Sequence, residues 1–386
     1  MQQANVDLVR LAVLVFAADR STPRAVGGTN WSQRDFAISV PVADEKRWTP
    51  VAGEIGELLQ FLTGDSWQVG FRSARPPKEQ VVQHLNLAGP PARVVLMSGG
   101  ADSALGALES RRLLTSAEGH VLVSHVGASA LAPIQRGVAA GISSLAPGPW
   151  QEQAQIHLIR RAAQVEGSPF KNEFSTRSRS FLFLALGLAI ASIHKVPLWI
   201  PENGFASLNP PLAPNRRGSL STRTTHPAFL GGLSDVLAKV GAQAEIVNPF
   251  ADRTKGEMFR IAADAFGDDA VSEFLSATHS CGLTGQRAFG LSVTVHCGVC
   301  FGCVVRRASF GAAKVVDRTA YASEVDDKRL QAWLHGKSVV PDVRAFVRRG
   351  IAVKDLAALS LPADFSMAAA RDLCDRASAE LREYVM

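Results

Sequence analysis

The chain has 386 residues, of which 47% are hydrophobic and 20% charged, a balance typical of globular proteins and not of disordered ones. The net charge of +6 is compatible with anionic ligands, but the basic residues are scattered, so a nucleic-acid partner is not expected. The longest apolar stretches, Leu11–Ala18 and Phe181–Ala191, are too short to cross a bilayer, which predicts a cytoplasmic protein with no membrane partner.

Residues 1–89 predict a small α+β module without a nucleotide signature, and its role does not follow from the sequence. An amphipathic helix is expected over Ile55–Leu62. Strands are expected over Val6–Phe16, Asp35–Val42 and Trp67–Phe71. Two proline-rich stretches, at 75–77 and 89–91, bracket a linker to the next domain.

An apolar strand over Val94–Met97 runs into a glycine-rich turn and then into an apolar helix that starts near Asp102. Gly99 and Gly100 lack Cβ atoms, so the backbone can turn tightly and bring its N–H groups against phosphate oxygens. The helix N-terminus adds a favourable interaction with an anion. No Lys follows in the G-K-[ST] arrangement, so this is not a Walker loop.

The PP-loop of the ATP pyrophosphatases, enzymes that adenylate a substrate with ATP, resembles the string Ser98-Gly99-Gly100-Ala101-Asp102-Ser103. The alternative is a plain strand-to-helix turn without a ligand. The resemblance implies that ATP is bound by Met97 and these six residues, with Asp102 holding a Mg²⁺ that lies on the phosphates.

Residues 92–265 alternate between strand and helix patterns, which predicts an α/β fold: a parallel sheet with helices on both faces. The expected strands are Val94–Met97, His120–His125, Ile156–Ile159, Pro197–Pro201 and Glu245–Val247. The expected helices are 102–113, 131–142, 176–193, 229–240 and 254–265. With the loop, this pattern resembles a PP-loop (adenine nucleotide alpha hydrolase-like) domain over 90–270. Residues 271–386 are expected to form a metal-binding and helical C-terminal region, with helices near 323–335 and 367–384.

Four of the five cysteines have the metal-site spacing C-x₁₅-C-x₂-C-x₂-C. They are Cys281, Cys297, Cys300 and Cys303. Four thiolates would close the shell of a structural Zn²⁺, while an iron–sulfur cluster is the alternative that the spacing leaves open. His279 and His296 flank the cysteines as alternative ligands, and Cys374 is expected in the core of a helix.

The combination of the loop, the cysteines and Arg306 is similar to the 7-cyano-7-deazaguanine synthases, the QueC-like proteins. The string Arg179-Ser180-Phe181-Leu182-Phe183-Leu184 resembles the family's Arg-Asn-x-x-Phe-Leu helix start, with Ser180 in place of Asn. The segment Asn248-Pro249-Phe250…Thr254-Lys255-Gly256-Glu257 resembles its Pro-Leu…Thr-Lys-x-Glu segment. The resemblance covers residues 90–312.

Two departures distinguish this chain from that family. It reads Ser-His-Val-Gly-Ala at 124–128 instead of Asp-Tyr-Gly-Gln, and Ser-Thr-Arg-Thr-Thr-His-Pro-Ala-Phe at 221–229 instead of Tyr-Pro-Asp-Cys-Arg-Pro-Glu-Phe. With the added residues 1–89, the chain looks like the divergent Qat-type QueC-like proteins of bacterial anti-phage operons. That resemblance implies antiviral defence, a protein partner from the same operon, and a homodimer.

The resemblance implies ATP-dependent activation of the carboxylate of 7-carboxy-7-deazaguanine. Attack on the α-phosphate would release pyrophosphate, and an amine would then displace AMP to form an amide. In the synthases proper a second ATP dehydrates the amide to a nitrile, whereas in the Qat-type subgroup the amine is expected to belong to a partner protein. The protein would contribute positioning and charge neutralisation.

Three residues are expected to carry this chemistry. Asp102 would hold Mg²⁺, and Lys255, which opens a helix after a strand end, would neutralise phosphate or adenylate charge, unless it is a solvated helix-start residue. Arg179, at another helix start on the same sheet edge, would bind phosphate or the substrate carboxylate, with Arg177 as the alternative.

The deazapurine is expected to contact Glu202 and Asn203 after the Pro197–Pro201 strand, and a polar cluster before Pro227. Glu202 would accept hydrogen bonds from the guanine-like edge, unless it caps a helix or pairs with an arginine. The cluster comprises Arg223, Thr224, Thr225 and His226. It is expected to form a substrate lid, unless Thr225 or His226 is only the N-cap of the next helix.

Two other functions compete with this one. A PP-loop tRNA-modifying enzyme would need a catalytic cysteine near the nucleotide domain, and residues 1–280 contain none. A non-catalytic scaffold in a defence complex would explain the altered substrate-side motifs, but the intact loop counts against it.

Overall fold

The computed structural model describes residues 1–24, 33–74, 88–158, 163–173, 176–211, 223–283 and 285–386. Within these residues the central element is a five-stranded sheet of order β5-β4-β3-β6-β7, in which every pair of neighbours is parallel. Its strands are β3 Arg93–Leu96, β4 Gly119–His125, β5 Trp150–Ile156, β6 Leu198–Trp199 and β7 Ile246–Val247. The predicted parallel sheet is thereby confirmed.

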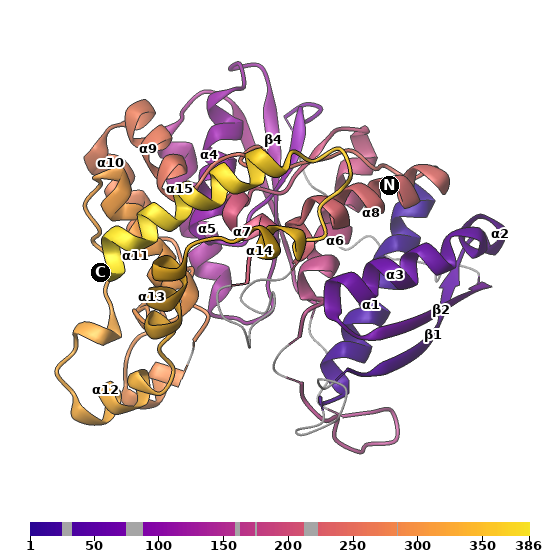
Figure 1. The fold of residues 1–386 in the computed structure, drawn as a ribbon. Helices are drawn as coiled ribbons and strands as arrows, with labels where there is room; N and C mark the ends of the chain where they lie inside the picture. The colour runs from indigo at the N-terminus through magenta and orange to yellow at the C-terminus, as the bar shows by residue number, and fades with distance from the viewer. Residues whose placement is uncertain (25–32, 75–87, 159–162, 174–175, 212–222, 284) are drawn as a thin grey trace.

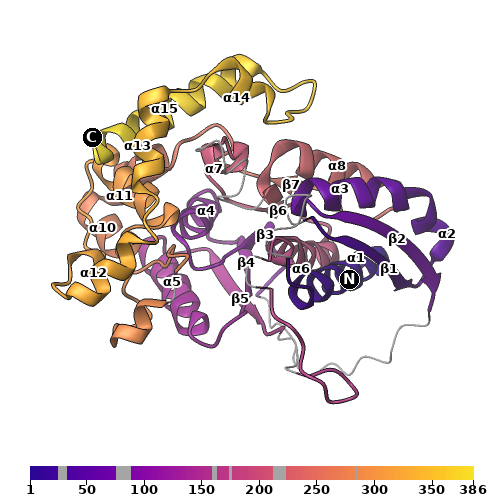
Figure 2. The same cartoon turned by 60° about the horizontal axis from the view of Figure 1, so that its bottom comes forward.

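Helices cover both faces of this sheet (Figures 1 and 2). One face packs against α4 Ala101–Arg112, α5 Leu131–Leu145, α9 Lys255–Phe266 and α10 Asp268–Ser276, and the other against α6 Arg179–His194 and α8 Pro227–Lys239. Successive side chains of β3, and of Met97 just after it, alternate between the two cores: Val94 and Leu96 face α6, and Val95 and Met97 face α4. Burial on both faces explains why these strands read as continuous apolar runs.

The third strand of the sheet was predicted in the wrong place. Ile156–Ile159 was expected, but β5 covers Trp150–Ile156, and Ile159 lies outside the described residues. The segment reads WQEQAQI, and all its residues are only half-buried because β5 is the edge strand next to β4. A polar edge strand lacks the apolar run by which a central strand is identified.

The prediction of a strand over Val6–Phe16 is wrong, because α1 is a helix over Gln3–Ser21. Its buried apolar residues are Ala4, Leu8, Leu11, Ala12 and Val15. These positions recur every three to four residues, which is the helical period. Polar residues are so few in this segment that the period is hard to recognise from the sequence. One face of α1 packs against α6, so it belongs to the core on that side of the large sheet.

The remaining N-terminal elements form a parallel two-stranded sheet of β1 Asp35–Val42 and β2 Ser66–Ser73. The connection contains α2 Glu45–Trp48, the 3₁₀ turn η1 Thr49–Val51, and α3 Ala52–Thr63, which confirms the predicted helix. Buried residues of this module and of α6 and α8 form one continuous core. The described residues 1–24 and 33–73 are therefore packed onto the same face of the large sheet as α6 (Figure 2).

The C-terminal part is helical. After the short elements α7 Gly204–Leu208, η2 Arg223–Thr225 and η3 Gly285–Phe289 come α11 Phe301–Ala313, η4 Ala322–Glu324, α12 Lys328–His335, α13 Val340–Arg349, α14 Val353–Ala357 and α15 Met367–Val385. The last helix lies across α11 and α13 and extends over the start of α9 (Figure 1). Cys374 is buried in this helical core, as predicted. None of the described helices combines the length and apolarity that a membrane crossing requires.

Candidate active site

The candidate site lies where the strand order reverses. The chain proceeds from β3 to β4 and β5 on one side, and then places β6 on the other side of β3. Ligands of open parallel sheets bind in the crevice at such a switch point, beyond the carboxyl ends of the strands. An open cavity of about 270 Å³ occurs there, bounded by the ends of β3, β4 and β6 and the start of α6. It is lined by Leu96, Ser98, Ser103, His125, Gly127, Leu131, Arg179, Ser180, Phe183, Ile200, Pro201, Glu202, Thr224 and Thr225.

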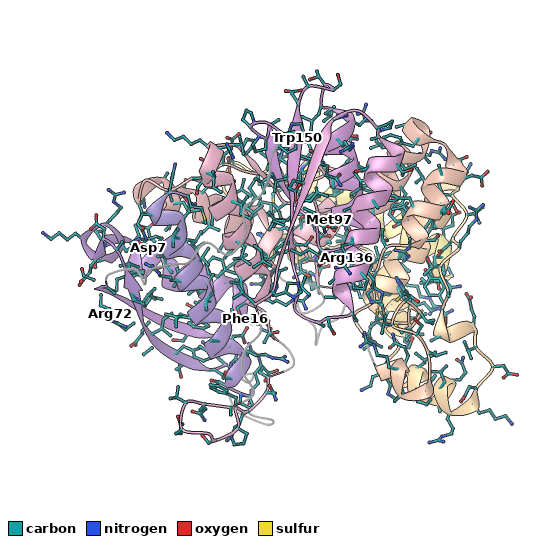
Figure 3. The ribbon with its side chains drawn as sticks, turned by 180° about the vertical axis from the view of Figure 1, so that it is seen from behind. Asp7, Phe16, Arg72, Met97, Arg136 and Trp150 are labelled. Carbon is teal, nitrogen blue, oxygen red and sulfur yellow. The ribbon has the colours of Figure 1, made fainter. Side chains whose placement is uncertain are left out.

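The glycine-rich turn joins β3 to α4 as predicted, and Met97 is fully buried at the end of β3 (Figure 3). Gly99 has φ +93°, and a Cβ there would lie 3.3 Å from Cγ of Gln135. Both the backbone conformation and the close approach of α5 therefore require glycine at this position. Gln135 also donates from Nε2 to the carbonyl of Ser98 at 3.2 Å and so ties the turn to α5.

Serine hydroxyls hold three N–H groups of the turn. The N–H of Ser98 donates to Ser103 Oγ at 3.1 Å, and that of Gly100 donates to Ser98 Oγ at 3.3 Å. The N–H of Ala101, the first residue of α4, donates to Ser280 Oγ at 3.3 Å. These contacts are at the long end of the range for such bonds, and hydroxyls are weaker acceptors than anionic oxygens. A phosphate group could replace them at the same N–H groups.

Asp102 and Lys255 form an ion pair beside the cavity, at 2.5 Å between Nζ and Oδ2. Only 7% of the Lys255 side chain and 13% of the Asp102 side chain are exposed, so the solvated helix-start reading of Lys255 is excluded. Lys255 is the first residue of α9, whose N-cap Thr254 forms a capping box with Glu257. The other oxygen of Asp102 accepts from the side chain of Asn203 at 3.0 Å.

Glu202 follows β6 and lines the cavity next to this pair. Asn203 donates to its Oε1 at 3.2 Å, and Asn248 accepts the backbone N–H of Glu202 at 3.2 Å and donates to its carbonyl at 2.9 Å. Burial, with the negative charge of Asp102, raises the pKa of Glu202 to about 8, although Lys255 opposes the shift. The carboxyl group is therefore protonated at neutral pH and can donate a hydrogen bond as well as accept one.

This protonation predicts a pH-dependent stability. A carboxyl group with a raised pKa binds its proton more tightly in the folded protein than in the unfolded chain. Its contribution to the free energy of unfolding is therefore complete below the unfolded pKa of about 4.3 and is lost as pH rises through the folded pKa of about 8. In Glu202→Gln we expect the free energy of unfolding to fall less steeply from pH 5 to 7 than in the wild type, by up to about 1.4 kcal/mol per pH unit. Urea unfolding across that range measures the slopes, with exposed Glu54→Gln as a control that keeps the wild-type slope. Parallel curves for the wild type and Glu202→Gln would show that Glu202 is already ionised.

The two arginines near the start of α6 have different surroundings. Arg179 lines the cavity and, within the described residues, forms no ion pair with a carboxylate. Arg177 instead donates from Nη1 to the carbonyl of Thr63 at 2.7 Å, and its backbone N–H donates to Asp19 at 2.9 Å. Of the two alternatives, only Arg179 is presented to a ligand in the cavity.

The predicted lid cluster is divided. Thr224 and Thr225 line the cavity, and Thr224 is hydrogen-bonded through its hydroxyl to Ser180. Arg223 stacks on Phe61 of α3, with Cζ 4.9 Å from the ring centroid, and does not line the cavity. His226 is the N-cap of α8, accepting the N–H of Ala228 at 3.2 Å, and burial lowers its pKa to about 4. The N-cap alternative thus holds for His226. Ser221 and Thr222, the first two residues of the 221–229 segment that departs from the family pattern, lie outside the described residues.

The four predicted cysteines form a cluster whose Sγ atoms all lie within 4.8 Å of one another. Cys303 Sγ lies 3.7 Å from that of Cys297 and 3.5 Å from that of Cys300. Sulfurs around a tetrahedral Zn²⁺, with bonds of about 2.3 Å, are about 3.8 Å apart, so the cluster fits a single ion such as zinc. The backbone N–H of Cys297 donates to Cys281 Sγ at 3.3 Å, an interaction that favours the thiolate that a metal requires.

The histidines that flank the cysteines do not join the cluster. The rings of His279 and His296 pack against each other, with centroids 4.7 Å apart. Arg306, which completed the family-like motif, is fully buried and hydrogen-bonds Thr278, Thr319 and the carbonyl of Leu275. It therefore anchors α11 to the end of α10 and does not reach the cavity.

The segment around Cys281 contacts the glycine-rich turn, and this contact could not be predicted from the sequence. Ser280, next to Cys281, accepts the first N–H of α4, and the N–H of His279 donates to the carbonyl of Gly99 at 2.8 Å. A Cβ at Gly302 would lie 2.4 Å from the carbonyl oxygen of Ser280, so the first turn of α11, which contains Cys303, also packs directly on this segment. Sequence reasoning also missed Gln135, although a glutamine on the apolar face of α5 is a signal of a buried polar contact.

Comparison with models of known protein families finds no match for this chain. Comparison with curated proteins likewise finds no similar sequence.

Proposed function

We propose that this protein activates the carboxylate of 7-carboxy-7-deazaguanine with ATP, releases pyrophosphate, and transfers the acyl group to an amine with loss of AMP. One observation carries the proposal. The PP-loop-like turn lies at the switch point of a parallel sheet, and the buried Asp102–Lys255 pair adjoins a cavity lined by Arg179 and Glu202. Groups that suit an anion, a cation and a guanine-like edge therefore lie close together, which supports the proposal.

The turn and α4 would bind the ATP phosphates, whose oxygens would replace the serine hydroxyls at the N–H groups of Ser98, Gly100 and Ala101. Asp102 fits a Mg²⁺ on those phosphates, because Mg²⁺ commonly takes one or two carboxylates together with phosphate oxygens. Lys255 would then stabilise the negative charge that develops on the phosphates during attack.

The acid would occupy the cavity beyond the turn. Arg179 provides a cation for the carboxylate, and a neutral Glu202 both donates and accepts hydrogen bonds, which suits the adjacent N–H and C=O groups of a guanine-like edge. The resemblance to Qat-type proteins supports a partner protein's amine as the acceptor and a role in antiviral defence. A zinc ion at the four cysteines would serve structure, since four thiolates leave no open position for chemistry.

The test is AMP formation by the purified protein with Mg-ATP, 7-carboxy-7-deazaguanine, and either ammonia or co-expressed proteins of its operon. We expect AMP and pyrophosphate in equal amounts, dependent on both the acid and Mg²⁺, and an amide detected by mass spectrometry on the base or on a partner. Reactions with 7-deazaguanine, which lacks the carboxylate, serve as the control. If no acceptor supports acid-dependent AMP formation, the proposed reaction is wrong and the scaffold alternative gains.

A further inference from the structure

A buried ionic network joins the N-terminal module to the start of α6. Asp19 and Asp65 are fully buried, and Arg34 lies between them, with Nη2 2.5 Å from Asp19 Oδ1 and 2.6 Å from Asp65 Oδ2. Arg24 pairs with Asp65 on its other side, at 2.7 Å. Asp19 lies near the end of α1 and Arg24 just after it, while Arg34 and Asp65 immediately precede β1 and β2, so the network ties one end of the module together.

Asp19 also reaches out of the module to α6. Its Oδ2 accepts the backbone N–H groups of Arg177 and Ser178 at 2.9 and 3.0 Å, and the hydroxyl of Ser178 at 2.6 Å. Ser178 is the fully buried N-cap residue of α6. One carboxylate of the N-terminal module therefore fixes the backbone immediately before this helix.

The two residues that directly follow Ser178 belong to the lining of the cavity. Arg179 and Ser180 begin α6, and Ser180 is hydrogen-bonded to Thr224, which also lines the cavity. Within the described residues Arg179 has no ion-paired carboxylate to orient its guanidinium, so its direction depends on where the backbone places it. The direction of the first turn of a helix is set by its N-terminal contacts, and Asp19 supplies three of them.

We propose that Asp19 is a positioning residue for the cavity: it acts through Ser178 to aim Arg179 and Ser180 at the anionic part of the acid substrate. The inference rests on the proposed function for the identity of that substrate. It assigns a role to the N-terminal module, which would support the substrate side of the site and not the ATP side. The ATP phosphates would instead lie at the turn before α4, which Asp19 does not contact.

The test compares Asp19→Asn with Asp7→Asn in the full-length protein. Asp7, labelled in Figure 3, is a matched control, because it is also a buried carboxylate of α1, paired with Arg10 and the N–H of Ala43. It lies twelve residues before Asp19, about 18 Å along the helix. Hydrogen exchange followed by mass spectrometry should show loss of protection in the first turn of α6 in Asp19→Asn only. We expect KM for 7-carboxy-7-deazaguanine to rise at least tenfold in Asp19→Asn, with Kd for Mg-ATP within about twofold of wild type.

Ser178→Ala provides a milder variant that leaves the Asp19–Arg34 pair intact, in case Asp19→Asn does not fold. It should raise KM for the acid in the same direction, by a few-fold, and Asp19→Glu should recover part of the loss in Asp19→Asn. If the first turn of α6 exchanges equally in the wild type and in both variants, or if the affinity for Mg-ATP falls as much as that for the acid, the positioning role is wrong. If exchange increases but the wild type forms no acid-dependent AMP, the proposed reaction fails and Asp19 still supports α6.

Discussion

Replacing Cys303 with serine is expected to abolish metal binding at the four-cysteine cluster and to destabilise the C-terminal part of the protein severely. Cys303 is fully buried and its sulfur is within 3.7 Å of two other thiol groups, so no solvent can complete the shell in its place. Structural zinc contributes about 10–16 kcal/mol of apparent binding free energy in small zinc domains, and loss of one ligand forfeits a large part of it. Metal analysis of the purified protein should give about one zinc per chain for the wild type and none for the variant.

The effect should extend to the nucleotide side of the molecule. Ser280 and His279, which hold the turn before α4, immediately precede Cys281. We therefore expect the affinity for Mg-ATP to fall at least tenfold in any Cys303→Ser protein that remains folded.

Cys374→Ala is the matched control, because Cys374 is equally buried but has no partner in the cluster. This variant should bind as much zinc as the wild type, and its free energy of unfolding should fall by about 1 kcal/mol, as is usual when a small buried side chain is truncated. A Cys303→Ser protein with full zinc content and wild-type stability would rule out the four-cysteine site. Iron in place of zinc in the wild type would favour the iron–sulfur alternative.

Replacing Asp102 with asparagine is expected to lower acid-dependent AMP formation by about 10²–10³-fold or more. Asparagine keeps the shape of the side chain but removes the charge that would hold Mg²⁺ and that balances Lys255 at 2.5 Å. The variant also leaves a buried ammonium group without its partner, which costs about 3–5 kcal/mol when the pair is deeply buried and less at a cavity wall. Rates of AMP release and urea unfolding together separate the two effects.

Lys255→Met and the double variant Asp102→Asn/Lys255→Met complete the comparison. The double variant has no unpaired charge, so it should regain stability relative to Asp102→Asn and yet remain inactive. Recovery of AMP formation along with stability would mean that the pair serves only the fold. Wild-type activity in Asp102→Asn would contradict the assignment of the loop and support the scaffold alternative.

Much of the fold could be predicted from local sequence, because its signals lie within a few residues of one another. The central strands are apolar on both faces, and apolar residues recur every three to four positions in the helices that cover them, so the parallel sheet could be predicted. The glycine-rich turn could be placed at a strand end for the same reason, and the short spacing of the last three cysteines indicated a metal site. The chemistry assigned to the turn remains a prediction.

Where the sequence failed, the deciding contacts join residues far apart in the chain. The helical period of α1 became clear only once its buried face packed on α6, and β5 was missed because an edge strand is half-exposed. Asp19 contacts Ser178, and Ser280 contacts Ala101, across more than one hundred residues, and neither pair follows a motif. A local pattern reports which face of a helix or strand is apolar, but not which elements meet there. The sequence alone thus determined the central strands of the sheet, the turn and the cysteine cluster, whereas tertiary packing decided the edge strand, which arginine faces the cavity and what holds it there.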